Sequence, residues 1–331
     1  MILNLHVAPC VLNEKLPKAD CFLDVIGQQE AIRTLSFYVK SHSKELPVPT
    51  LLYSGSHGLG KTMMAKRLAM ALDRHFVEVN CGKIKSARDF FDRVLFEVFE
   101  QMKSNGSKGV TILLDEAHAI DSNFKDVLLS LLNPNESNRN VIPDGEKNII
   151  WDMTKINVVL ASTDVYKIAA PLRNRCTDIY FYRYSVQEIV EILNLYLRDK
   201  ESDSVKITCN HEDLAQVCRE RARNTFLFSQ DVKRFLFAKN GNKKIFDDND
   251  LRQLKQTKGI GEFGLIRAEL DLFRVICEMG PISAKNIAAQ MMVDVKNIEE
   301  ELEIRLRELG FIKNTHSGRI ATELGKKTLL K

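Results

Sequence analysis

The residues best suited to chemistry lie in one glycine-rich stretch. Gly55, Gly60, Lys61 and Thr62 fit the spacing of a glycine, four residues and then Gly-Lys-Thr, and the apolar run 51–53 precedes them. Glycines let backbone N–H groups close around phosphate oxygens, and the N-terminus of the helix expected after them adds a favourable dipole. Lys61 would reach the β and γ phosphates of ATP, and Thr62 would supply a hydroxyl to Mg2+. The stretch predicts a phosphate-binding loop rather than a glycine-rich turn that happens to carry a lysine.

Two adjacent acids form a second chemical feature. Asp115 and Glu116 end the unbroken apolar run 110–114, a pattern typical of a buried parallel strand. Ligands sit at the carboxyl ends of such strands. Asp115 can hold Mg2+ through water, and Glu116 can polarise the water that attacks the γ phosphate. The phosphate loop upstream favours this interpretation over a pair of solvated acids.

Three further segments would complete a nucleotide site. Ile26, just before a helical pattern from Gln29, would be an apolar wall for the base or a plain core residue. Thr163 follows another buried strand and would contact the γ phosphate or the attacking water. Arg175 lies beyond that strand, and it either reaches a phosphate of a neighbouring subunit or is a surface arginine.

Length and composition indicate the class of protein. A chain of 331 residues suggests two or three domains, and 44% hydrophobic with 28% charged residues is typical of a globular protein. Apolar runs stay well short of a membrane span, and the start lacks the features of a signal peptide, so we expect a cytoplasmic protein. The seven cysteines never follow a CxxC spacing, which favours reduced thiols over disulfides or a zinc site.

The C-terminal part follows a winged-helix pattern. A mostly helical region to about residue 257 predicts a lid, and a linker at 259–264 precedes helical stretches at 269–279, 283–292 and 295–309 and a hairpin around residues 316–318. Residues 294–310 hold three basic and six acidic side chains, whereas residues 311–331 hold five basic and one acidic. We therefore expect the wing, with Lys313 and Arg319, to contact the DNA backbone and the third helix to be repelled by it. The alternative is a winged helix that binds protein.

A second hairpin is expected over residues 139–152, with a Pro143-Asp144-Gly145 turn. It carries Ile149 and the chain's one tryptophan, Trp151. These apolar side chains either form a docking tip for a partner or pack against the domain.

In order along the chain, the motifs DVIGQ, GSHGLGKT, LLDEAH, ASTD, PLRNRC and GFIKNTHSGRIAT resemble those of the RuvB family, the bacterial ATPase that drives Holliday-junction branch migration. The likeness covers residues 22–331. The nucleotide motifs alone place the chain in the wider AAA+ class, whereas the terminal wing segment is specific for RuvB.

The resemblance implies an α/β fold: a P-loop ATPase domain with a parallel sheet between helices at 23–183, a helical lid at 184–258 and a winged helix at 259–331, after an extension at 1–22. It implies a hexameric ring around duplex or four-way junction DNA, with ATP and Mg2+ as cofactors and no membrane contact. The nucleotide would be held by Ile26, Gly27, Gly58, Leu59, Gly60, Lys61, Thr62, Met63 and Asp115, with Thr62 and Asp115 on the metal. Glu116, Thr163 and a trans-acting Arg175 would carry catalysis, Arg319 would match a DNA-contacting wing arginine, and the 139–152 hairpin would match the region that docks on RuvA.

Several positions depart from the family pattern. Leu16-Pro17 stands where the family has Arg-Pro, and Ser317 stands at a usually basic wing position. Where the family carries Gly-Thr-Pro-Arg, this chain has Asn224, Thr225, Phe226 and Leu227, so the sensor 2 arginine is missing there and Lys233 or Arg234 are the nearby cations. Weaker coupling of nucleotide state to the lid is expected.

The predicted function is an ATP-driven DNA translocase of the branch migration machinery. One alternative is an AAA+ loader or initiator that uses ATP as a switch, because Asn174-Arg175-Cys176 is similar to the Ser-Arg-Cys of clamp loaders. Another is a nucleotide-binding scaffold with little turnover, because the sensor 2 arginine is missing.

Overall fold

The computed structural model describes residues 21–84, 86–96, 98, 109–144, 147–198, 205–240 and 245–330. The chain divides into two compact units. The sheet unit runs to Tyr184 and takes in Arg221–Arg223, whereas the helical unit comprises Ser185–Glu220 and the chain from Asn224 onward. The predicted N-terminal extension lies outside the described residues except for Cys21 and Phe22, which are buried in a turn.

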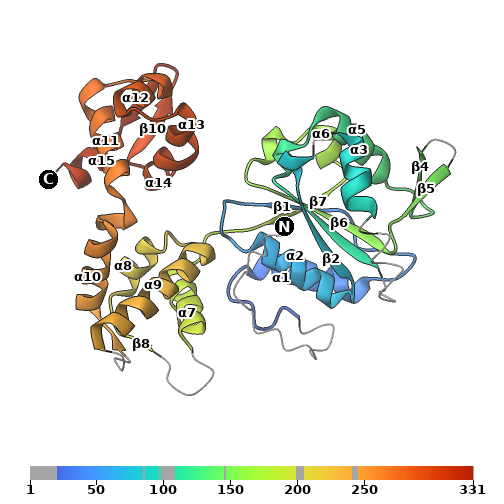
Figure 1. Ribbon diagram of the computed structural model, residues 1–331, viewed down its shortest axis with the longest axis horizontal. Coiled ribbons are helices and arrows are strands. Elements are labelled where there is room, and N and C mark those ends of the chain that lie inside the picture. Colours follow the sequence, from blue (N-terminus) through green and yellow to red (C-terminus); the bar gives the residue numbers. More distant parts are fainter. Residues whose placement is uncertain are drawn as a thin grey trace. The chain divides into compact units, whose positions relative to one another are not determined.

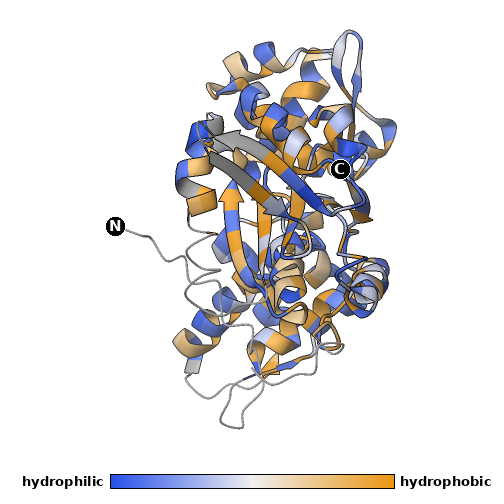
Figure 2. Ribbon diagram, turned by 90° about the vertical axis from the view of Figure 1, so that its right-hand side faces the viewer, coloured by the Kyte–Doolittle hydropathy of each residue, from blue (hydrophilic) through white to orange (hydrophobic). Residues whose placement is uncertain are grey.

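The sheet unit is built on five parallel strands in the order β2-β3-β6-β1-β7. They are β1 (Leu51–Ser54), β2 (His75–Asn80), β3 (Val110–Asp115), β6 (Ile156–Ser162) and β7 (Thr177–Tyr180). A parallel sheet is buried on both faces and therefore needs near-continuous apolar strands, which appear largely orange in Figure 2. The predicted α/β class is confirmed.

Helices cover both faces of this sheet (Figure 1). One face carries α1 (Gln29–Ser41) and α2 (Lys61–Ala71), and the other carries α3 (Ala87–Phe90), α5 (Ser122–Leu131) and α6 (Ala170–Arg173). A π-helical turn at Phe91–Leu95 continues α3, and short 3-10 turns lie at Cys81–Lys83, Ala117–Ala119 and Val165–Lys167. In the described part of this helical stretch, Val94, Leu95 and Val98 are buried.

The predicted hairpin consists of β4 (Arg139–Asp144) and β5 (Lys147–Asp152). Its turn differs from the prediction, because β4 continues through Pro143, which pairs with Asn148, and Asp144, which pairs with Lys147. The connection thus falls at 145–146, outside the described residues. A proline is tolerated here because each strand of a two-stranded ribbon has a free edge.

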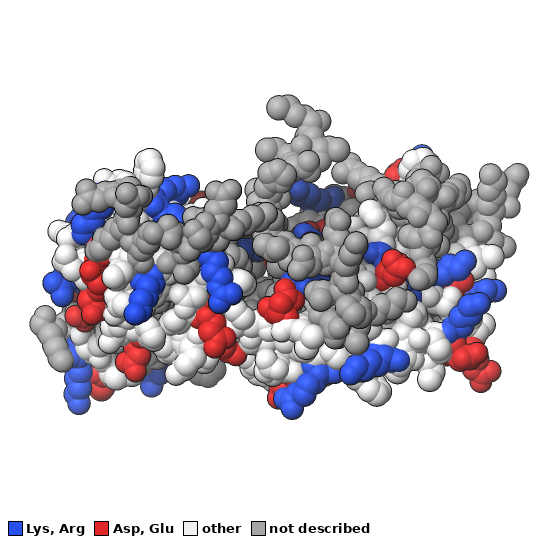
Figure 3. Space-filling model, turned by 90° about the horizontal axis from the view of Figure 1, so that it is seen from below, with Lys and Arg blue, Asp and Glu red and all other residues white. Residues whose placement is uncertain are grey.

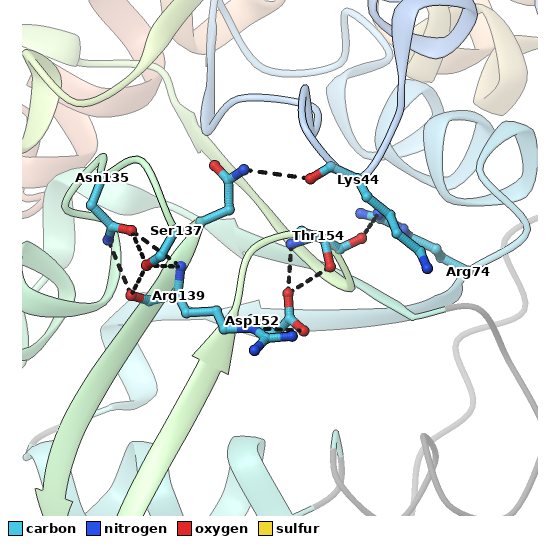
Figure 4. A network of polar contacts seen from close by, with 8 residues as sticks. Lys44, Arg74, Asn135, Ser137, Arg139, Asp152 and Thr154 are labelled. Atoms are coloured by element: carbon cyan, nitrogen blue, oxygen red, sulfur yellow. Dashed lines mark hydrogen bonds and ion pairs between the residues drawn. The ribbon is translucent and has the colours of Figure 1, made fainter.

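A polar network anchors the base of the hairpin (Figure 4). The Asp152 carboxylate accepts from the Thr154 hydroxyl at 2.6 Å and faces Arg139 at 3.6 Å. Arg74, which precedes β2, donates to the Thr154 carbonyl at 2.7 Å, and Asn138 donates to the Glu45 carbonyl at 3.3 Å. The orientation of the hairpin is thereby fixed by segments before β1 and β2.

The first part of the helical unit holds α7 (Val186–Leu197), α8 (His211–Val217), α9 (Ala222–Asn240) and α10 (Asp248–Lys258), with a parallel pair β8 (Lys206–Ile207) and β9 (Ile245–Phe246). Helix α7 begins with a capping box, in which the Ser185 hydroxyl accepts from the Glu188 N–H and the Glu188 carboxylate accepts from the Ser185 N–H. None of the helices within the described ranges is long and apolar enough to cross a membrane.

The second part of the helical unit is a winged helix, as predicted. It contains a 3-10 turn at Glu262–Gly264, α11 (Arg267–Met279), α12 (Ala284–Met291), α13 (Val295–Asn297), a π-helical turn at Ile298–Leu302, α14 (Glu303–Glu308), the wing strands β10 (Ile312–Thr315) and β11 (Gly318–Ala321), and α15 (Glu323–Leu329). Helix α15 was not predicted. Gly318 has φ +128°, and a Cβ there would lie 2.4 Å from the Ile282 carbonyl, so only glycine lets β11 bridge to Ile282.

Two arginines join the parts of the helical unit. Arg305, only 1% exposed, pairs with Glu220 at 3.4 Å and donates to the Phe263 carbonyl. Arg219 pairs with the buried Glu269 at 2.9 Å. Buried charges that are paired in this way are strongly destabilising to separate, so the lid and the winged helix are held as one body.

Candidate nucleotide-binding site

The phosphate-binding loop lies between β1 and α2, as predicted. Gly58 (φ +77°) and Gly60 (φ +95°) both occupy the left-handed region, which glycine adopts without steric cost. The Lys61 ammonium donates to the carbonyls of Gly55 at 2.6 Å and Ser56 at 2.8 Å. The Tyr184 hydroxyl donates to the Leu59 carbonyl at 3.0 Å. The loop is therefore held in a closed curve whose backbone N–H groups can surround phosphate oxygens.

Lys61 carries an unusually acidic ammonium group. Burial lowers its pKa to about 8; Arg223 and Arg221 also lower it, whereas Asp115 and Glu116 act in the opposite sense. A phosphate chain would restore the ammonium form, because opposite charge stabilises it. Thr62 and Met63 follow on the first turn of α2 and are half-buried.

Glu116 lies between two histidines. Its carboxylate is 3.6 Å from Nδ1 of His57 in the phosphate loop and 3.4 Å from Nδ1 of His118. Burial lowers the pKa of His57, and the cations Lys61, Arg223 and Arg221 lower it further against the opposing effect of Glu116, so His57 is neutral at pH 7. A neutral His57 does not neutralise the Glu116 carboxylate, which can therefore polarise a water molecule.

Asp115, Ser162 and Thr163 lie at the same edge of the sheet. Ser162 lies within 3.1 Å of His118 and accepts from the Asp164 N–H, so the end of β6 is bonded to the residues after β3. Thr163, half-buried, is the next residue along the chain. The structure thus brings the ends of β3 and β6 to the edge at which β1 enters the phosphate loop.

The donor set at this edge fits Mg2+. Thr62 offers a hydroxyl and Asp115 a carboxylate, of which one oxygen accepts from the Glu116 N–H at 3.0 Å. Within the described ranges, no group of three or more His, Cys, Asp or Glu side chains could hold a metal ion. Mg2+ is usually held by one or two protein oxygens together with substrate phosphates and water, so this sparse set suits it. Thr62 and Asp115 would hold the ion, which would neutralise phosphate charge.

The segment before α1 carries the predicted base contacts Ile26 and Gly27. Ile26 is half-buried and Gly27 has φ +73°. The amide nitrogen and oxygen of the Gln28 side chain bond to the Tyr182 backbone, at 2.6 and 3.0 Å. The buried Arg67 of α2 forms a two-pronged pair with Asp24 at 2.6 and 2.8 Å. This segment is thereby fixed to the residues after β7 and to the phosphate-loop helix.

Comparison with known proteins identifies the family. Residues 51–184 match the model of the ATPase family associated with various cellular activities (AAA), and residues 262–330 match the RuvB C-terminal winged helix domain. The chain belongs to the RuvB family. Its AAA module supports ATP hydrolysis.

Relatives cover nearly the whole chain. The Holliday junction branch migration complex subunit RuvB of Phytoplasma mali is 26% identical over 94% of this chain and 92% of its own length. The same subunit from Anaplasma marginale (strain Florida) is 26% identical over 99% and 93%. A solved structure of the Thermotoga maritima RuvB branch migration motor matches with a TM-score of 0.74 at 22% identity, covering 92% of this chain and 95% of that one. At 22% identity, this last match is evidence for the fold alone.

Arg175 of this RuvB-family chain lies just after α6. Its guanidinium donates to the Pro171 carbonyl at 2.8 Å and to the Asn133 side chain at 3.4 Å. These two contacts hold the side chain half-buried rather than loose on the surface. Its predicted action on a neighbouring subunit stays a prediction.

The structure corrects the docking prediction for Trp151. Its side chain is fully buried in the core of the sheet unit, together with Leu131 and Ile156. A side chain without exposed surface cannot be offered to a partner. Val141 and Ile150 of the same hairpin are instead 57% and 58% exposed, and the side chain of Ile149 lies outside the described part.

The wing prediction changes at Arg319. Its guanidinium pairs with Glu303 at 2.9 Å and Glu299 at 2.8 Å, and the bond to Glu303 is the main reason that its pKa is raised. The acids of the third helical stretch therefore hold the wing arginine. Lys313 is exposed on the same wing. On the face drawn in Figure 3, the basic and acidic side chains of the described residues are interspersed. The charge of this face as a whole therefore does not indicate where DNA would bind.

Several residues of the site were missed from the sequence. They are His57 and His118, which contact Glu116, together with Arg67, Gln28 and Tyr184, which bond to Asp24, Tyr182 and Leu59. Apart from the contact of His118 with Glu116, two residues away, these contacts join residues distant in the chain. Gln28 belongs to the quoted DVIGQ motif, and His57 and His118 belong to the motifs GSHGLGKT and LLDEAH. These three residues could therefore have been predicted from the sequence.

Proposed function

We propose that this RuvB-family chain is an ATP-driven translocase that moves duplex DNA at Holliday junctions in the cytoplasm. The main observation in support of this proposal is that one chain combines the nucleotide site with a winged helix of the RuvB type. The names of its relatives support the junction as substrate. In this proposal the ATPase domain begins at residue 23, the lid at residue 184 and the winged helix at residue 259.

The proposed assembly is a hexameric ring in which each ATP site is shared between two neighbouring subunits. Lys61 binds phosphate, Thr62 and Asp115 hold Mg2+, Glu116 polarises water and Thr163 orients it near the γ phosphate. Arg175 reaches the triphosphate of the next subunit, where a guanidinium stabilises the charge of the transition state. Ile26, Gly27, Leu59 and Met63 line the base and loop side of the pocket.

DNA and a partner would be held elsewhere on the chain. Lys313 contacts the DNA backbone, and Arg319 positions the wing through Glu299 and Glu303. A RuvA-like protein docks on the hairpin through its exposed Val141 and Ile150.

The deciding experiment is steady-state ATP hydrolysis with and without a synthetic four-way junction, and with and without a RuvA-like protein. We expect stimulation by the junction and loss of turnover in Lys61→Ala and Glu116→Gln. Turnover without any strand exchange in a junction-migration assay would favour a loader or initiator. Binding of ATP without turnover would favour a nucleotide-binding scaffold. That alternative is considered because Leu227 stands where the family has the sensor 2 arginine.

A further inference from the structure

A short arginine-rich segment lies against the phosphate loop. Arg221–Arg223 groups with the sheet unit although the residues on both sides belong to the helical unit. The Arg223 N–H donates to the Gly58 carbonyl at 3.2 Å. A Cβ built on Gly58 would lie 3.0 Å from the Arg223 Cβ and 3.6 Å from the Arg221 Cβ. The two arginines therefore begin in direct contact with the loop.

Their charges act on the groups of the nucleotide site. Both arginines lower the pKa of Lys61 and of His57, although burial is the larger cause in each case. His57 lies 3.6 Å from Glu116, the residue that would polarise the attacking water. Cations that repel one another around a glycine loop favour the binding of a polyanion, and their influence extends to the end of the site where hydrolysis would occur.

The other two cations considered from the sequence, Lys233 and Arg234, lie further along α9, within the helical unit. Leu227, at the family's sensor 2 position, is apolar and 57% exposed. Arg234 pairs with Asp231 on its own helix at 3.5 Å, within the helical unit. Arg223 is exposed, and the backbone bond to Gly58 fixes where its side chain starts.

We propose that Arg223, with Arg221 beside it, contacts the γ-phosphate end of bound ATP and replaces the sensor 2 arginine that Leu227 cannot supply. This inference rests on the proposed function, since it assumes that the loop binds ATP. Because the anchoring bond uses the backbone N–H, replacing the side chain leaves that bond in place.

The test is calorimetric titration of the full chain with Mg-ATP and Mg-ADP in a Glu116→Gln background, which prevents turnover. Arg223→Ala should weaken ATP binding about tenfold or more, as expected for a charged hydrogen bond, and ADP binding by less than about threefold. Arg223→Lys should recover part of the ATP affinity. The matched control is Arg88→Ala, a 90% exposed arginine of the sheet unit, which should bind both nucleotides like the parent.

Unchanged ATP affinity in Arg223→Ala, or an equal loss for ATP and ADP, would overturn the inference. So would a loss of ATP affinity in Arg234→Ala with none in Arg223→Ala. A parent protein that binds neither nucleotide would instead refute the proposed function itself. Thermal melting of each variant separates loss of contact from loss of fold.

Discussion

Lys61 is a residue whose charge changes with pH close to neutrality. With a pKa of about 8, its ammonium form is present below pH 8 and lost above it. Bound triphosphate stabilises the ammonium form, so binding above pH 8 requires proton uptake and the Kd for ATP should rise by up to ~10-fold per pH unit. Calorimetry between pH 7 and 9.5 measures this, with Lys61→Arg as a variant that does not titrate. A wild-type Kd that stays constant across that range would contradict the prediction.

Glu116 gives a second prediction for a single residue. Glu116→Gln keeps the size of the side chain but removes the base, so turnover should fall by about 10²–10⁴-fold while ATP binding is retained. Turnover and titration calorimetry on the same preparation measure the two effects. Equal loss of binding and turnover would assign Glu116 a structural role.

Single residues were predictable where a motif fixes them and unpredictable where only the fold supplies a neighbour. The loop residues Gly60, Lys61 and Thr62 and the acids Asp115 and Glu116 lie where their spacing placed them. Local spacing carries no information on the approach of Arg223 to Gly58, because that contact depends on how the chain returns to the sheet unit.

At the scale of the elements, the β4–β5 hairpin contains one residue that tests packing and another that tests docking of a partner. Trp151→Ala should destabilise the protein by about 3–5 kcal/mol, because it empties a fully buried aromatic site. Ile150→Asp should leave the melting temperature nearly unchanged but abolish stimulation by a RuvA-like partner, because Ile150 is exposed. Undiminished stimulation in a folded Ile150→Asp protein would remove the hairpin from the partner interface.

The wing allows a similar comparison. Lys313→Ala should weaken DNA binding and lower the salt slope of the binding constant by about one, because one phosphate contact is lost. Arg319→Ala should chiefly lower stability, because it removes the nearer cation from the buried Glu303 and leaves only Arg307 at 3.5 Å. DNA titrations at several salt concentrations, paired with melting curves, distinguish the two roles. A full unit of salt slope lost in a stable Arg319→Ala protein would restore Arg319 as a DNA contact.

Elements were predictable to the extent that their pattern is periodic. The apolar strands and the amphipathic helices were found, whereas α15 was missed because its sequence is short and polar. Its cap offered a signal, since the Thr322 side chain accepts from the Gly325 N–H. The acidic third helix of the winged helix was recognised from its charge, but its pairing with Arg319 depends on tertiary packing.

At the scale of the whole molecule, the central claim is that each ATP site is completed by Arg175 of a neighbouring subunit. The claim implies that hydrolysis belongs to the assembled ring rather than to the single chain. Arg175 lies between α6 and β7, where its guanidinium donates to Pro171 and Asn133, and not in the phosphate loop of its own subunit.

Mixing two inactive variants tests this claim most directly. Arg175→Ala has an intact Glu116, and Glu116→Gln has an intact Arg175, so a site formed between them is complete. Equal mixing with random assembly should restore roughly a quarter of wild-type ATP turnover per subunit, since about one interface in four combines both intact groups. If the mixture stays as inactive as its components although the subunits assemble together, Arg175 does not act across the interface and the account is contradicted.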